Sequence, residues 1–157
     1  MAMDESQALQ ETISILETIP GGRAVIEWFG GQPEFGDAEI LELRLVRRGP
    51  SVLRVSATAS ENRRGPPFRH AVFEFTLRDT IDVHLDGFSH QNVIGGLRLR
   101  AAKDQPAHPG VRGIGVARGV VELEVTPCAG AHGMVRCTVE KIAITRVENY
   151  QTADKDQ

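Results

Sequence analysis

The residues best suited to chemistry lie in the stretch from Asp82 to Asn92. Asp82, His84 and Asp86 alternate with apolar residues. Because successive side chains of a strand point to opposite faces, these three share one face. The run ends in a polar cluster made of Ser89, His90, Gln91 and Asn92. A histidine and a carboxylate on one strand face, with a loop histidine able to bend back, could act as an acid/base or metal-binding group. His84, Asp86 and His90 are therefore the first candidates.

Three interpretations of this polar turn stay open. A metal site is poorly matched, because a mononuclear zinc site takes three or four ligands and the spacing fits no closed zinc pattern. No serine or cysteine lies in a nucleophile elbow. The turn can instead satisfy its own backbone groups, as short polar side chains commonly do, or it can recognise a partner. The sequence thus predicts no catalytic residue, no metal and no cofactor. A partner-binding role falls on Asp82, His84, Asp86, His90 and Gln91.

Asp37 and Glu39 form a second pair of carboxylates at the start of an alternating segment. They lie two residues apart and therefore on the same strand face. Charges at such a position serve as edge charges or turn caps. They can also meet a basic partner surface, since complementary charge raises association rate and specificity. Asp37 and Glu39 complete the set of candidate partner-binding residues.

Alternation with period two dominates the chain after residue 37 and predicts the strands that position these residues. Strands are expected over 40–47, 52–59, 69–77, 81–86, 93–100, 120–126 and 135–147, the last as one long bulged strand or two short ones. The first strand should turn Leu41, Leu43 and Leu45 toward the core and form a hairpin with the second. Residues 60–67 and 103–115, rich in breakers, are expected to be loops.

Helical spacing precedes the strands. Apolar residues recur at three- and four-residue intervals over 9–19, after Asp4 or Ser6 as an N-cap. One or two further helical turns are expected over 23–29.

These patterns predict a mainly β chain with some α+β character. We expect an antiparallel β-sandwich or a strongly curved sheet with one or two short N-terminal helices. The chain should form a single domain over 1–157, with a helical preface at 4–29, a β-domain at 37–147 and a disordered tail at 148–157.

Composition excludes several classes of protein. The chain has 157 residues, 41% hydrophobic and 25% charged, with a formal net charge of -3 and a pI near 6.0. This balance disfavours nucleic-acid binding, which needs a basic surface. No apolar run is long enough to span a membrane, and the acidic N-terminus is unlike a signal peptide. Cys128 and Cys137 belong to no CxxC pair and are expected as free thiols, with a hairpin disulfide as the alternative. We expect a cytoplasmic protein.

Several motifs together resemble a known family. The chain carries Trp28, Pro33 and Phe35 ahead of Asp37-Ala38-Glu39-Ile40, then Phe73-Glu74-Phe75, and then Leu85-Asp86-Gly87-Phe88-Ser89-His90-Gln91-Asn92-Val93-Ile94. With a late strand pair around Leu123 to Arg146, this pattern resembles the immunity protein 50 family of bacterial polymorphic-toxin systems. The resemblance covers about 28–147, and the turn that begins at Gly87 is its most specific part.

The resemblance implies a small cytoplasmic protein that is not an enzyme and that neutralises a cognate protein toxin by binding it. It also implies that Gly87, Phe88 and Asn92 define the fold of the turn. The chain departs from the family at Gly36, where a histidine often precedes the Asp-Ala-Glu step. If that histidine belongs to a functional site, the site is altered in this chain; if it only shapes a turn, glycine can replace it.

Two other functions stay open. One is a small metal-dependent or acid/base enzyme that uses His84, Asp86 and His90. The other is a β module that forms homo-oligomers by pairing exposed strand edges.

Overall fold

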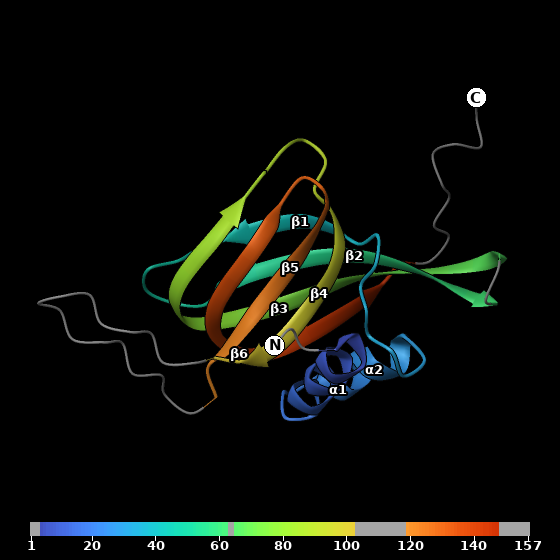
Figure 1. Ribbon diagram of the computed structural model, residues 1–157, viewed down its shortest axis with the longest axis horizontal. Coiled ribbons are helices and arrows are strands. Elements are labelled where there is room, and N and C mark those ends of the chain that lie inside the picture. The colour runs from blue at the N-terminus through green and yellow to red at the C-terminus, as the bar shows by residue number, and fades with distance from the viewer. Residues whose placement is uncertain (1–3, 63–64, 103–118, 148–157) are drawn as a thin grey trace, which may run out of the picture.

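A computed structural model describes residues 4–62, 65–102 and 119–147, which form two short helices and six strands. The helices are α1 (Glu5–Leu16) and α2 (Gly22–Trp28). The strands are β1 (Glu39–Arg44), β2 (Ser51–Asn62), β3 (Gly65–Asp86), β4 (Val93–Ala101), β5 (Val121–Ala129) and β6 (His132–Arg146). Figure 1 shows the strands wrapped around a common interior, with both helices below one end of the sheet. The prediction of a mainly β chain with N-terminal helices is confirmed.

The sheet is a closed antiparallel barrel in the order β1-β2-β3-β6-β5-β4, so the expectation of a sandwich is wrong. Long, bulged strands explain the closure. β3 has 22 residues and β6 has 15, and their ladder shifts register twice. Bulges bend a strand and increase its twist, which coils a sheet until its edges meet. The edges meet where Glu39 of β1 pairs with Val93 of β4.

The first strand faces the core differently from the prediction. β1 and β2 form the expected hairpin, but the register shifts between Ile40 and Glu42. This bulge reverses the side-chain alternation. Ile40 and Leu43 therefore turn toward the core, while Leu41 and Leu45 are 47% and 52% exposed.

The remaining strand boundaries also differ in part. The expected loop at 60–67 is mostly strand, since β2 continues to Asn62 and β3 begins at Gly65. The strands expected at 69–77 and 81–86 are one strand, β3, with a register shift between Arg78 and Asp82. The segment expected at 135–147 is the single long strand β6.

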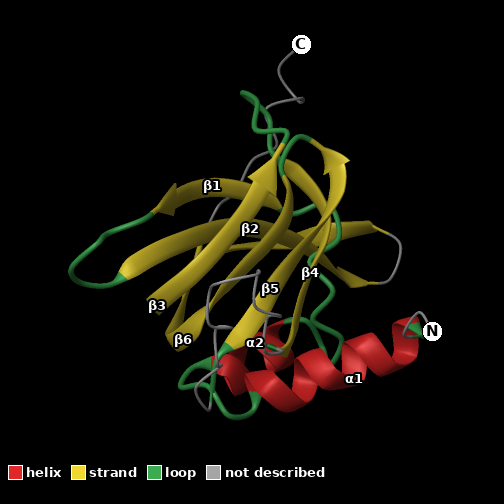
Figure 2. Cartoon of the chain, turned by 60° about the vertical axis from the view of Figure 1, so that its left-hand side comes forward, coloured by secondary structure: helices red, strands yellow, loops and turns green. Residues whose placement is uncertain are grey.

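The helical preface closes one end of the barrel. Asp4 caps α1 by accepting a hydrogen bond from the backbone N–H of Ser6 at 2.9 Å. After α2, the chain inserts a cluster of aromatic rings between the helices and the strands. Trp28 lies 5.2 Å from Phe73 of β3, and Phe35 lies 5.2 Å from the same ring. Such edge-to-face contacts add to the stabilisation from apolar burial. Figure 2 shows both helices across this end of the barrel.

Side chains of α1 cover the part of β4 that has no neighbouring strand. The hydroxyl of Thr12 accepts from the N–H of Leu99 at 3.1 Å, and Glu11 accepts from the N–H of Ala101 at 2.9 Å. The carbonyl of Glu34 accepts from the N–H of Leu97 at 3.4 Å. These bonds give acceptors to backbone N–H groups of β4. Without them, these groups would lack a hydrogen-bond partner or could pair with a strand of another chain.

The tail at 148–157 and the connection at 103–115 lie outside the described residues. Cys128 is exposed and Cys137 is buried, and both are free, so the alternative of a disulfide is wrong. No helix in the described ranges is long and apolar enough to cross a membrane.

Candidate functional site

The stretch from Asp82 to Leu99 forms two strands that do not pair with each other. β3 pairs with β2 and β6, whereas β4 pairs with β5 and β1. The segment 87–92 therefore crosses from one side of the barrel to the other. Asp86 pairs with His132 and Val93 pairs with Ala129, so the crossing segment spans the turn between β5 and β6. Figure 1 shows this loop passing over the tip of the β5–β6 hairpin.

Two glycines allow the loop and the hairpin tip to approach closely. Gly87 has φ 75°, and a Cβ there would lie 2.6 Å from the carbonyl oxygen of Gly130. Gly130 has φ 114°, and a Cβ there would lie 2.5 Å from the carbonyl oxygen of Gln91. Any other residue would meet both a strained backbone and a backbone clash. The structural role expected for Gly87 thus has a direct physical reason.

Hydrogen bonds within the loop fix its shape. Asn92 accepts from the N–H of Ser89 at 3.0 Å and donates to the carbonyl of Ser89 at 2.9 Å. The hydroxyl of Ser89 donates to the carbonyl of Gln91 at 2.7 Å. Asn92 thus bridges both backbone groups of Ser89. Phe88 is 52% exposed, so its ring lies outside the core and is displayed by the loop.

Beside the loop, the end of β3 presents the predicted polar face. Nε2 of His84 lies 2.9 Å from Oδ2 of Asp82, and a carboxylate oxygen of Asp86 accepts from the N–H of Gly87 at 2.8 Å. His132, which the sequence did not single out, joins this face from β6 opposite Asp86. His84, Asp86 and His132 line an open hollow of about 450 Å³. Finding His132 required the β3–β6 register, because the residue lies 46 positions from Asp86.

Asp37 and Glu39 approach the other end of the loop. The N–H of Asp37 donates to the carbonyl of Ile94 at 3.0 Å, and Glu39 pairs with Val93. The N–H of Ile40 donates to the carbonyl of Asn92 at 3.0 Å. The tertiary structure thus brings the two predicted groups to the two ends of one loop. We call Asp37, Glu39, Asp82, Asp86 and the loop 87–92 the acidic end.

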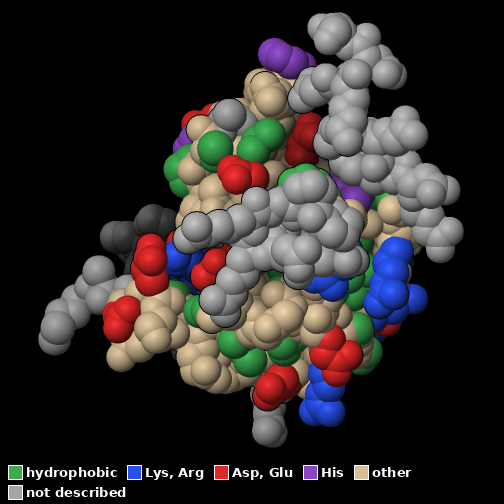
Figure 3. Space-filling view, turned by 90° about the vertical axis from the view of Figure 1, so that its right-hand side faces the viewer, with side chains coloured by type: hydrophobic (Ala, Val, Ile, Leu, Met, Phe, Trp, Pro, Cys, Tyr) green, Lys and Arg blue, Asp and Glu red, His purple; other side chains and the backbone are tan. Residues whose placement is uncertain are grey.

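The segments that form the acidic end have an excess of acidic over basic residues. Residues 37–40, 82–94 and 127–135 contain four carboxylates and no lysine or arginine. In Figure 3, the acidic and histidine side chains visible at the upper end of the molecule stand apart from the basic side chains, which lie lower. A surface of one sign attracts partners of the other sign and speeds their association.

Two arginines on the neighbouring strands both bind Glu122. Across four strands, Asp82, Arg136, Glu122 and Arg100 follow one another in register. Arg136 donates to Glu122 at 2.7 Å, and Arg100 donates to Glu122 at 2.9 Å. Burial by itself raises the pKa of Glu122, but the hydrogen bonds and charges of the two arginines outweigh burial and hold this pKa below its ordinary value.

The candidate metal ligands of the acidic end do not gather into one group. Within the described ranges, no three His, Cys, Asp or Glu side chains form a group that could hold a metal ion. His84, Asp86 and His90 therefore do not form the ligand set that the metal-dependent alternative requires. The close pair is His84 with Asp82, and His84 is exposed on the surface.

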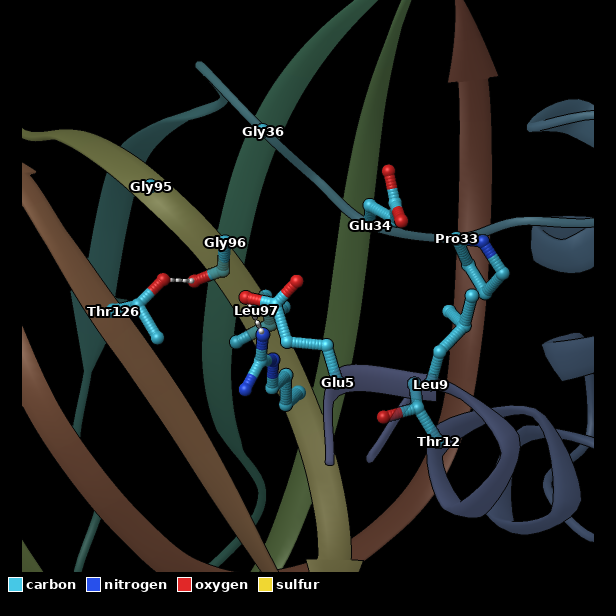
Figure 4. A pocket seen from close by; sticks show the side chains of 11 residues that line it. Glu5, Leu9, Thr12, Pro33, Glu34, Gly36, Gly95, Gly96, Leu97 and Thr126 are labelled. Atoms are coloured by element: carbon cyan, nitrogen blue, oxygen red, sulfur yellow. Dashed lines mark hydrogen bonds and ion pairs between the residues drawn. The ribbon is translucent and has the colours of Figure 1, made fainter. Parts of the chain in front are cut away.

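A separate cleft lies between α1, the segment 33–36 and β4 (Figure 4). It has a volume of about 230 Å³. Glu5 lies 3.7 Å from Arg98 across it, and Thr126 donates to the carbonyl of Gly96 at 3.2 Å. Gly36, the position of the departure from the family pattern, lines this cleft rather than the acidic end. Among the described residues, the ionisable side chains that line the cleft are Glu5, Glu34 and Arg98.

Comparison of the chain with protein-family models, curated proteins and solved structures finds no match.

Proposed function

We propose that the protein neutralises a cognate protein toxin by binding it stoichiometrically, with the acidic end as the binding surface. The observation that carries this proposal is the loop 87–92, which displays the half-exposed ring of Phe88 between two pairs of carboxylates. Exposed aromatic rings at the centre of an interface often supply most of the binding energy. A surrounding rim of charge then sets specificity and association rate.

The rigidity of the loop supports binding rather than a mobile active-site lid. Ser89 and Asn92 hold the loop by two hydrogen bonds, and Gly130 lies directly against it. A surface that already has its bound shape loses little conformational entropy when a partner docks. The expected partner surface is basic, and it has an apolar pocket for one aromatic ring.

The apolar part of the proposed surface extends beyond the loop. Leu41 is 47% exposed and follows Ile40, whose N–H is bonded to Asn92. Exposed apolar groups next to charged groups resemble the core and rim of a protein interface. An interface of ordinary size covers about 800 Å² on each partner, which is ample to include Leu41, Phe88 and the four carboxylates.

The test is co-expression with the product of the adjacent gene. The wild-type protein should restore growth and co-purify with the toxin as a stable complex. Asp86→Lys combined with Glu39→Lys should weaken the complex, and the loss should grow as the salt concentration falls. Phe88→Ala should weaken the complex by about tenfold or more, mainly through faster dissociation.

The control is Glu17→Lys, which makes the same change of charge as each of the two reversals alone, at the exposed C-cap of α1, far along the chain from the loop. It should leave rescue and affinity unchanged. Rescue that survives the double charge reversal and Phe88→Ala would sink the proposal for this surface. Absence of both rescue and a complex with the wild-type protein would sink the toxin-binding proposal itself.

A further inference from the structure

A second cavity lies between α2 and the strand ends near residues 69 and 146. Its volume is about 320 Å³. It is lined by Ala24, Glu27, Trp28, Arg69, Ile144 and Arg146. Pockets that bind small organic molecules begin at about this size. We call it the arginine cavity.

Both arginines continue the inward-facing series of their strands toward the strand ends, where Arg69 is partly buried and Arg146 is exposed. Ala71 and Phe73 of β3 are fully buried in the barrel, and Arg69 precedes them with the same parity. On β6, Ile144 packs against the core and Arg146 follows it with the same parity. Arg146 pairs with Ala71, so Arg69 and Arg146 are diagonal neighbours, about 7–8 Å apart at the backbone and within reach of each other's long side chains.

Neither guanidinium has a carboxylate partner among the described residues, and the two like charges repel each other. The Nε atom of Arg69 is buried and has no hydrogen-bond acceptor. Its Cζ lies 5.2 Å from the centre of the Trp28 ring, a contact that holds the guanidinium in place. A buried donor without an acceptor is costly, and an anion in the cavity would compensate the positive charge of the two guanidinium groups.

We propose that the arginine cavity binds a small organic anion that has a flat apolar body and a carboxylate or phosphate group. Arginine matches these oxyanions because its planar fork can donate two parallel hydrogen bonds. Trp28, Ala24 and Ile144 supply an apolar wall for the body of the ligand. This site is independent of the acidic end and does not rest on the proposed toxin binding.

Trp28 makes the proposal directly measurable, because it is the only tryptophan of the chain and it lines the cavity. The full-length protein is titrated with benzoate, phenyl phosphate and inorganic phosphate at constant ionic strength, with neutral benzamide as a control. Benzoate or phenyl phosphate should change the tryptophan fluorescence saturably, and benzamide should not. The tighter of the two identifies the preferred oxyanion. Inorganic phosphate that binds as tightly as phenyl phosphate would overturn the apolar part of the proposal.

Three variants test the roles of individual charges. Arg146→Gln, at an exposed position, should weaken binding about tenfold or more, the usual effect of losing one charged hydrogen bond. Glu27→Gln removes a carboxylate from the lining and should tighten binding roughly two- to fivefold. Arg44→Gln is the control of equal charge, and it lies in β1 beside Glu42. No saturable signal with any anion, or equal affinity of Arg146→Gln and Arg44→Gln, would overturn the proposal.

Discussion

The bond between α1 and the edge of β4 can be tested by replacing Thr12 with valine. Thr12 is 1% exposed, and its hydroxyl accepts from the N–H of Leu99 at 3.1 Å and lies 3.0 Å from the carbonyl of Ala8. Valine has nearly the same shape and the same branching at Cβ, so Thr12→Val leaves neither a large cavity nor a new helix preference. It removes only the hydroxyl and leaves the N–H of Leu99 buried without an acceptor.

Leaving one buried donor unpaired costs about 1–3 kcal/mol. We therefore expect Thr12→Val to lower the free energy of unfolding by about 2 kcal/mol. In a domain of this length each kcal/mol shifts Tm by about 2–4 °C, so Tm should fall by roughly 4–8 °C. Thr12→Ser keeps the hydroxyl and loses one methyl group, which costs about 1 kcal/mol.

Urea unfolding followed by circular dichroism measures the free energies, and amide hydrogen exchange reports on Leu99 directly. The control is Ser14→Ala on the same helix, where an exposed hydroxyl donates to the carbonyl of Gln10 at 2.9 Å. That change should stay within about 0.5 kcal/mol of wild type. If Thr12→Val is as stable as Ser14→Ala, or if exchange at Leu99 is unchanged, α1 does not stabilise the barrel edge in the way argued.

Three further outcomes are expected. Gly130→Ala should destabilise the protein and loosen the loop, because its Cβ would meet the carbonyl of Gln91 at 2.5 Å and its φ is positive; a crystal structure and unfolding curves with wild-type values would contradict this. The folded protein holds the pKa of Glu122 below its ordinary value of about 4.5, so ionised Glu122 stabilises the fold. This stabilisation should be complete above about pH 4.5 and should be lost as the pH falls through the lower pKa of the folded state. Unfolding measured at several pH values should show this dependence in the wild type and a smaller one in Glu122→Gln. Burial raises the pKa of Cys137 to about 12. Iodoacetamide at pH 8 should therefore alkylate only Cys128 in the folded protein, and mass spectrometry would show this. Rapid labelling of both cysteines in the folded protein would count against a buried thiol.

Local sequence patterns predicted the elements well, because they depend on neighbours along the chain. The β1–β2 hairpin and the helix start at Asp4, one of the two expected caps, follow from spacing and turn chemistry, and the structure confirms them. The prediction of which residues of β1 face the core was wrong, because a single bulge at Leu41 reverses the alternation of side chains. A bulge is set by the partner strand, which periodicity does not reveal.

The candidate site was likewise predictable in its residue types but not in its spatial arrangement. Its residue types were visible in the sequence, including the polar turn and the pairs of carboxylates at 37–39 and 82–86. Their meeting at one end of the barrel was not visible, because it depends on which strands are neighbours. The arginine cavity also escaped notice, since Arg69 and Arg146 are far apart in the sequence and become diagonal neighbours only through the β3–β6 register.

The sequence by itself therefore determined a mainly β chain, its helical start and the polar character of the turn after Asp86. Only the tertiary structure decided that the sheet closes into a barrel and that the turn crosses over the β5–β6 hairpin instead of joining paired strands. It also decided that α1 covers the edge of β4. The physical reason is that alternation fixes which side of a strand is buried, whereas closure and strand order arise from twist, bulges and hydrogen bonds between distant segments.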